Sequence, residues 1–156
     1  MAITTTSSAQ ILNVADRLYP VEKWGKLRLA YFDVTQGVAA GDINSTFLLC
    51  DLPYGRIRIL PQLSLIANSA WGASTVLDIG HLVYKDSSGN DVAANYSALV
   101  TGLSVAAADA DGQKMGTLLK WDMFSKAGVR MAAQVRGAVV PAAATMSGYF
   151  IFVDQN

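Results

Sequence analysis

Few residues in this sequence could perform catalytic chemistry. It contains one histidine, His81, and one cysteine, Cys50. A nucleophilic thiol needs a neighbouring base and an acid that orients the base. His81 lies in STVLDIGHLVY among aliphatic residues that share its strand face, and Cys50 lies in the apolar segment FLLCDLP, where a thiol usually packs as a small hydrophobe. No G-x-S-x-G motif is present. We expect no catalytic site and no enzyme, although the sequence leaves open a constellation of Cys50, His81 and an aspartate.

Two aspartate-rich segments have the composition of a calcium loop without its spacing. DADGQKMGTLLK, at 109–120, carries Lys114 and Lys120 where a calcium loop needs glycine and glutamate. DSSGND, at 86–91, has the composition of a hairpin turn. One histidine and one cysteine are too few for a structural zinc site, and neither a P-loop nor GxGxxG is present. We expect no metal and no cofactor; adventitious calcium at either loop stays open.

The composition describes one domain-sized chain with little charge. It has 156 residues, of which 52% are hydrophobic and 15% charged, and 12 cationic side chains balance 12 acidic ones. Without a basic surplus, binding to nucleic acid is not expected. No apolar run is long enough to cross a membrane, and the N-terminus lacks the features of a signal peptide. So few charges suggest that some apolar surface meets another chain.

Arginines alternate with isoleucines in LPYGRIRIL. Arg56 and Arg58 lie on one side of the expected strand, and Ile57 and Ile59 lie on the other. The simple interpretation is a strand with one solvated face. The functional interpretation is an electrostatic contact with a protein partner, since no glycine-rich turn leads into a helix that could hold phosphate. Arg56 and Arg58 are therefore candidate interface residues.

Alternation with period two dominates from residue 26 onward and predicts eight strands. In KLRLAYFDV, Leu27, Leu29 and Tyr31 share one face of the expected strand. The opposite face is charged at the start of the strand and apolar towards its end, which predicts a strand that starts half exposed and ends covered on both sides. The eight expected strands span residues 26–34, 45–51, 55–60, 62–68, 75–85, 117–124, 128–136 and 146–154.

The intervening segments predict turns, among them DADG at 109–112, and one helix. Residues 95–107 show helical spacing after a possible cap at Asn95, so we expect a short helix there. Residues 1–24 are expected to form an N-terminal arm, flexible over its first nine residues, with a short helix between Ser8 and Pro20. Residues 25–156 are expected to form a single all-β domain, an antiparallel β-sandwich of the jelly-roll type.

The C-terminal strand SGYFIFV is apolar on both sides. Tyr149 lies on one side, and Phe150 and Phe152 lie on the other. Such a strand is either central and covered on both faces or meets another subunit. We take Tyr149, Phe150 and Phe152 as candidate interface residues and expect a homotrimer.

A carbohydrate-binding function is an alternative. Sugar sites stack aromatic rings on the ligand beside carboxylate or amide acceptors. Trp71 near Asn68, and Trp121 next to Asp122, offer that combination. A receptor- or glycan-binding jelly-roll module is therefore the second class of function.

Three segments resemble a known family. They are LPYGRI at 52–57, VLDIG at 76–80, and a closing strand with PAAA at 141–144 and Gly148 before Tyr149. They are similar to the patterns L-P-x-G-[RK]-[IV], [TV]-L-D-[ILV]-G and P-A-G-A-x-x-x-G-Y of small structural proteins encoded among the virion genes of tailed bacteriophages. Ala143 stands where the last pattern has glycine.

The resemblance implies a jelly-roll decoration or cement protein. Such a protein would stabilise an icosahedral shell by bridging subunits of the major capsid protein. It would lie on the outer surface of the virion, commonly as a homotrimer, and would not be an enzyme. A neck or fibre-base component of the same virion is an alternative that the sequence does not separate from cement.

Overall fold

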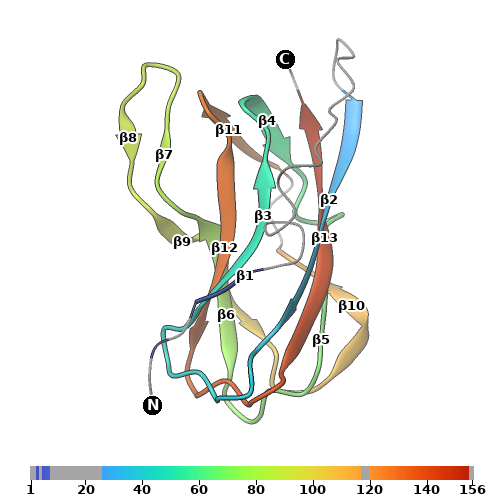
Figure 1. Cartoon of the computed structure of the whole chain (residues 1–156). Helices are drawn as coiled ribbons and strands as arrows, with labels where there is room; N and C mark the ends of the chain where they lie inside the picture. Colours follow the sequence, from blue (N-terminus) through green and yellow to red (C-terminus); the bar gives the residue numbers. More distant parts are fainter. Residues whose placement is uncertain (1–2, 4, 8–25, 117–119, 155–156) are drawn as a thin grey trace.

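The computed structural model describes Ile3 and residues 5–7, 26–116 and 120–154. Within these residues it contains 13 strands and no helix (Figure 1). The strands are β1 (Thr5–Ser7), β2 (Lys26–Thr35), β3 (Thr46–Leu52), β4 (Gly55–Ile59), β5 (Leu65–Asn68), β6 (Val76–His81), β7 (Tyr84–Lys85), β8 (Asp91–Val92), β9 (Asn95–Ser104), β10 (Asp109–Lys114), β11 (Trp121–Ser125), β12 (Val129–Arg136) and β13 (Thr145–Asp154).

Two sheets form the sandwich. One has the strand order β1-β3-β12-β6-β9. In the other, β13 lies in the middle: β2 pairs with one edge of β13 along its whole length, and β4 and β5 pair with the other edge at opposite ends. β11 then pairs with β4, and β10 pairs with β5. We call these the five-stranded and the six-stranded sheet.

The strands pair as one long antiparallel hairpin that has been rolled up. β2 pairs with β13, β3 with β12, β4 with β11, β5 with β10, β6 with β9 and β7 with β8. In each directly opposed pair along this ribbon, the two residue numbers have nearly the same sum, as expected for a single continuous hairpin. Examples are Thr35–Thr145, Gly55–Ser125 and Val76–Ser104. The pairs β3/β12 and β6/β9 lie in the five-stranded sheet, and the pairs β2/β13, β4/β11 and β5/β10 lie in the six-stranded sheet. The ribbon thus passes back and forth between the two sheets, which is the jelly-roll arrangement expected from the sequence.

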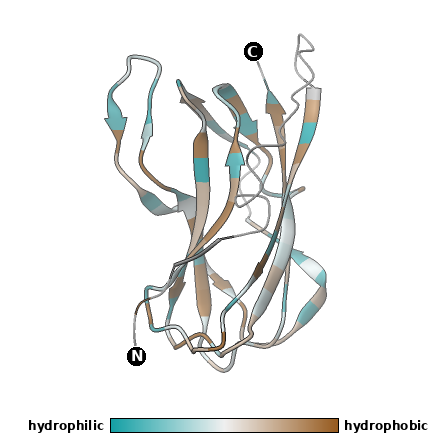
Figure 2. Ribbon diagram, viewed as in Figure 1, coloured by the Kyte–Doolittle hydropathy of each residue, from teal (hydrophilic) through white to brown (hydrophobic). Residues whose placement is uncertain are grey.

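The tip of the ribbon is the segment at 86–91. Asp86 accepts hydrogen bonds from the backbone N–H groups of Ser88 and Asn90, at 2.8 and 2.9 Å. These bonds hold the pKa of Asp86 below its usual value, and the bond from Asn90 has the largest effect. The turn predicted for DSSGND is confirmed, and the hairpin of β7 and β8 projects from the sandwich with mostly hydrophilic residues (Figure 2).

The core lies between the two sheets. Alternate residues of β2 and β13 point into it, and Phe32 packs against Phe150 with ring centroids 5.6 Å apart. The largest fully buried side chains are Trp71, Phe47, Phe150, Leu49, Leu52, Ile57, Ile59, Ile66, Leu77, Ile79, Met115 and Met131. Ile57 and Ile59 therefore face inward, as the alternation predicted.

The helix predicted for residues 95–107 is wrong, because this segment forms β9 instead. Its pairing with β6 shifts twice, so that Leu77 lies opposite Leu103 while Ile79 lies opposite Val100. The first shift adds one residue to β9, and the second, between Ile79–Val100 and His81–Asn95, adds three. The apolar residues of β9 therefore do not follow the period of two that marks a regular strand. The turn predicted around DADG is likewise part of a strand, β10, with an irregular register between Asp109 and Gln113.

The N-terminal arm contains regular structure that we did not expect. Thr5–Ser7, taken as part of a flexible segment, form β1 and pair in parallel with β3 at the edge of the five-stranded sheet. The helix expected between Ser8 and Pro20 lies outside the described residues.

Candidate interaction face

The solvent side of the six-stranded sheet, here called the outer face, carries an apolar strip. Three consecutive residue pairs of β2 and β13 lie directly opposite one another on this side. The pairs are Leu27–Val153, Leu29–Ile151 and Tyr31–Tyr149. Leu27, Leu29 and Tyr31 are 59%, 49% and 61% exposed. The strip leaves a continuous apolar surface in contact with solvent.

The prediction for this face was wrong. Leu27, Leu29 and Tyr31 were expected on the covered side of a half-exposed strand. The structure buries the other side of β2, with Phe32 and Val34 in the core. Two apolar faces were recognised, but the order of pairing in space decides which one the second sheet covers.

β13 is central in its sheet, and its two faces differ. Phe150 and Phe152 are 0% and 4% exposed and belong to the core within one chain, so they are corrected from interface candidates to core residues. Tyr149 lies on the other side and is half-buried. Of the three candidates on this strand, only Tyr149 lies on the outer face.

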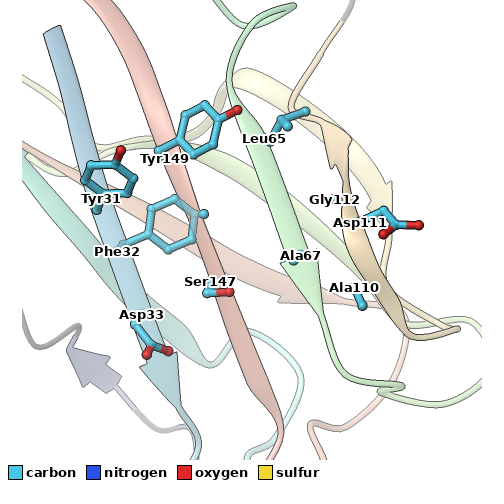
Figure 3. Close-up of a pocket in the computed structure, with 11 residues that line it drawn as sticks. Tyr31, Phe32, Asp33, Leu65, Ala67, Ala110, Asp111, Gly112, Ser147 and Tyr149 are labelled. Atoms are coloured by element: carbon cyan, nitrogen blue, oxygen red, sulfur yellow. The ribbon is translucent and has the colours of Figure 1, made fainter.

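A shallow groove of about 490 Å³ lies at one end of the outer face (Figure 3). Tyr31 and Tyr149 meet edge to face on one side of it, with ring centroids 5.9 Å apart. Leu65 contributes to its wall. Asp33 comes from β2 and Asp111 from β10, so the groove has a carboxylate on each side (Figure 3).

The opposite end of the outer face carries the two arginines. Arg58 lies directly opposite Val153 on one side and Asp122 on the other. Its guanidinium donates two hydrogen bonds to the Asp122 carboxylate, at 2.6 and 3.2 Å. Lys120 approaches the same carboxylate at 3.8 Å. Arg56 is exposed and lies opposite Phe124.

The pairing of Arg58 with Asp122 shifts the pKa of both groups. The hydrogen bond from Arg58 lowers the pKa of Asp122, and the charges of Arg58, Lys120 and Arg56 act in the same direction. The same hydrogen bond raises the pKa of Arg58. We call this end of the outer face, with Arg56, Arg58, Lys120 and Asp122, the arginine end.

The solvent side of the five-stranded sheet is different. Arg130 donates two hydrogen bonds to Asp51, at 2.7 and 3.1 Å. Arg136 pairs with Asp78 at 3.3 Å. The charges on that side are matched within the chain, which leaves the outer face as the stronger candidate for contact with a partner.

The structure does not bring together the residues with catalytic potential. Cys50 and His81 both lie opposite Met131, on either side of β12, so about two strand spacings, roughly 10 Å, separate them. His81 is buried between aromatic rings, stacked on Trp121 at 5.6 Å and edge-on to Tyr84 at 5.0 Å. This is the environment of a core histidine.

The side chains of the two pairs proposed as sugar sites make other contacts within the chain. Trp71 is 2% exposed and packs against Phe47, so its ring cannot stack on a ligand. Trp121 packs against His81, and the carboxylate of Asp122 is held by Arg58.

Neither a metal cluster nor a membrane helix occurs in the described part of the chain. No group of three or more His, Cys, Asp or Glu side chains there is arranged to hold a metal ion. No helix within the same residues is long and apolar enough to cross a bilayer.

Two solved structures share the fold. A chain in the capsid of Ralstonia phage GP4 superimposes with a TM-score of 0.67 at 14% identity, covering 98% of this chain and 99% of that one. A chain of the cyanophage Pam1 capsid asymmetric unit gives a TM-score of 0.56 at 16% identity, covering 90% of this chain and 94% of that one. No family model and no curated protein matches the sequence. The chain thus has a jelly-roll fold that is also found, over nearly its whole length, in two phage capsids.

Proposed function

We propose that this chain is a structural protein of a tailed-phage virion that decorates the outer surface of the icosahedral capsid. In this role it bridges neighbouring subunits of the major capsid protein and acts as cement rather than as an enzyme. The observation that carries the proposal is the agreement in fold over 98% of the chain with a chain in the capsid of Ralstonia phage GP4.

The surface of the molecule supports a binding role. The exposed apolar strip of the outer face provides area for association. A specific complex buries about 1,600 Å² in total. A homotrimer that contacts several capsid subunits at once would add its contacts, because each further contact forms at a high effective concentration.

The test is binding to capsids of the parent phage assembled without this protein. The purified full-length chain is added, and bound protein is separated by sedimentation and imaged by electron microscopy. We expect saturable binding at repeated lattice positions and a shell that resists heat or low salt better than the undecorated one. Density confined to the neck or fibre base would contradict cement and identify the alternative structural role. No density on any part of the particle would refute a virion function.

A further inference from the structure

The groove on the outer face is formed by small residues that lie between larger ones. Asp33 on β2 lies directly opposite Ser147 on β13, and Ser147 lies opposite Ala67 on β5. The rings of Tyr31 and Tyr149 stand beside this row of residues (Figure 3). The groove of about 490 Å³ is therefore large enough for a ligand, since sites for small molecules usually measure about 300–1,000 Å³.

The far rim of the groove is an irregular part of β10. The pairing of β10 with β5 shifts between Asp109 and Gln113, and the N–H of Gly112 donates to the Asp109 carboxylate at 2.9 Å. Asp111 lies within this irregular segment and is exposed. Three strand spacings, about 14 Å, separate β10 from β2, which carries Asp33. The groove therefore crosses the sheet with one carboxylate at each rim.

Both rim carboxylates are available to a ligand. Within the described residues, neither Asp33 nor Asp111 makes an ion pair or a side-chain hydrogen bond. Lys114, opposite Leu65 on β10, adds one positive charge to this part of the outer face. Two carboxylates and one ammonium group leave it with a negative surplus, which favours a cationic ligand over a neutral one.

An exposed aromatic ring lies next to one of these carboxylates. Tyr31 is 61% exposed and precedes Asp33 by two residues on the same face of β2, so the two are about 7 Å apart along the strand. A guanidinium is planar, stacks on aromatic rings and donates hydrogen bonds to a carboxylate. Tyr31 and Asp33 together therefore suit an arginine side chain better than a lysine side chain.

We propose that the groove binds an arginine side chain on the surface of the major capsid protein. The guanidinium lies against Tyr31 and pairs with Asp33, while the aliphatic part of the side chain lies over Ser147 and Ala67. Asp111 adds a weaker attraction from the opposite rim. The identity of the partner rests on the proposed function, whereas the arginine site itself does not.

A second copy of this chain is a poor source of that arginine. All five arginines of the described residues already interact within the chain: Arg28 with Asp154, Arg58 with Asp122, Arg130 with Asp51, Arg136 with Asp78, and Arg56 with a further group. Each would have to give up a contact to enter the groove of another copy. A homotrimer remains compatible with the proposal, because every copy keeps its own groove for the capsid protein.

The first experiment titrates the isotope-labelled full-length chain with N-acetyl-arginine methylamide and follows the backbone amides by NMR. We expect saturable shifts at the amides of Asp33, Ser147 and Ala67, with a dissociation constant in the millimolar range. The matched probe is N-acetyl-citrulline methylamide, which has nearly the same shape without the charge and should bind at least about 10-fold more weakly. Equal binding of the two probes, or no shifts at the groove, would overturn the arginine site.

Substitutions of the carboxylates test which of them pairs with the guanidinium. Asp33→Asn should weaken binding of the arginine probe about 3- to 10-fold, and Asp111→Asn about 2-fold or less. Asp91→Asn is the matched control, because it removes the same charge from the projecting hairpin, and it should bind as the wild type does. Shifts at the groove with maltose but none with the arginine probe would identify a sugar site instead and refute the proposal.

The second experiment identifies the partner by binding of the same variants to undecorated capsids of the parent phage. Asp33→Asn should reduce capsid affinity about 10-fold at low salt, because the loss is repeated at each groove of an oligomer, and Asp91→Asn should not. Circular dichroism establishes that each variant is folded.

The two experiments separate this inference from the proposed function. If the wild type binds capsids and Asp33→Asn binds equally well, the capsid protein is not the partner of the groove, and the inference fails while the proposed function stands. If the arginine probe binds the groove but the wild type does not bind capsids, the proposed function and the assigned partner fail while the arginine site stands.

Discussion

The ring of Phe32 occupies the space that a side chain on Gly148 would need. The two residues lie directly opposite one another on β2 and β13. A Cβ atom on Gly148 would lie 2.8 Å from Cζ of Phe32 and would also collide with the backbone of Leu65. The missing side chain lets an aromatic residue from the edge strand reach across the central strand into the core, where it meets Phe150.

Gly148→Ala should therefore destabilise the protein. Because the contact involves backbone as well as the ring, we expect a loss of about 1–3 kcal/mol in the free energy of unfolding, as for other overpacked cores. Urea denaturation followed by fluorescence gives the value. Gly37→Ala is the control, since a Cβ at Gly37 meets nothing within 4 Å. Equal effects of the two substitutions would show that β13 can shift away from Phe32.

Asp78 explains part of the VLDIG motif. One carboxylate oxygen accepts the backbone N–H of Gly102 at 2.9 Å, next to the bulges between β6 and β9, and the other accepts from Arg136. Asp78 is buried, so Asp78→Ala would leave the Gly102 N–H without its acceptor. We expect a loss of about 1–3 kcal/mol.

Asp91→Ala is the comparison for Asp78→Ala. Asp91 pairs with Lys85 on the exposed hairpin, where an ion pair contributes little. We expect a change within about 0.5 kcal/mol by the same urea assay. A loss at Asp91 as large as that at Asp78 would contradict the assignment of Asp78 as a buried acceptor.

The ion pair of Arg58 and Asp122 predicts a pH dependence. The hydrogen bond from Arg58 lowers the pKa of Asp122 in the folded state below its ordinary value of 3.8. The stabilisation from this ion pair is thus complete above pH 3.8. It is lost as the pH falls through the lower pKa that Asp122 has in the folded state. Asp122→Asn should lower the thermal midpoint slightly at neutral pH, and the difference from wild type should disappear at strongly acidic pH. A difference that persists there would mean that the pair acts through something other than the charge of Asp122.

The fold class was predictable because alternation records which strands are half-buried. Ile57 and Ile59 turned inward as expected, and the turn at 86–91 was placed correctly. What the sequence did not reveal is which strands become neighbours in space. The exposure of Leu29 and the burial of Phe150 both follow from β2 and β13 pairing across the full ribbon.

The candidate face was only partly predictable for the same reason. Arg56 and Arg58 were identified from local alternation, whereas Asp33 and Asp111 come from strands far apart in sequence. The bulges in β9 and β10 obscured alternation locally, so one segment was taken for a helix and the other for a turn. Local patterns identify the faces of single strands, but the groove exists only once the ribbon is rolled.

Ala143 has a positive φ of 56°, a backbone conformation that favours glycine. It is the third residue of a turn in which the N–H of Ala144 donates to the carbonyl of Pro141 at 3.3 Å. A positive φ at that position of a β-turn is usually supplied by glycine or asparagine. This gives a physical reason for the glycine in the family pattern P-A-G-A, from which this chain departs.

Ala143→Gly should consequently stabilise the protein, although glycine loses more backbone entropy on folding. Removing the strain of an alanine in the left-handed region should outweigh that entropy loss. We therefore expect the free energy of unfolding to rise by about 0.5–1 kcal/mol. Ala142→Gly provides the control: Ala142 is exposed in the same turn, and its φ is not positive, so only the entropy loss remains and stability should fall by about 0.4–1 kcal/mol. Urea denaturation should therefore show changes of opposite sign in the free energy of unfolding of the two variants. A loss of stability at Ala143 would mean that the turn already accommodates alanine without strain.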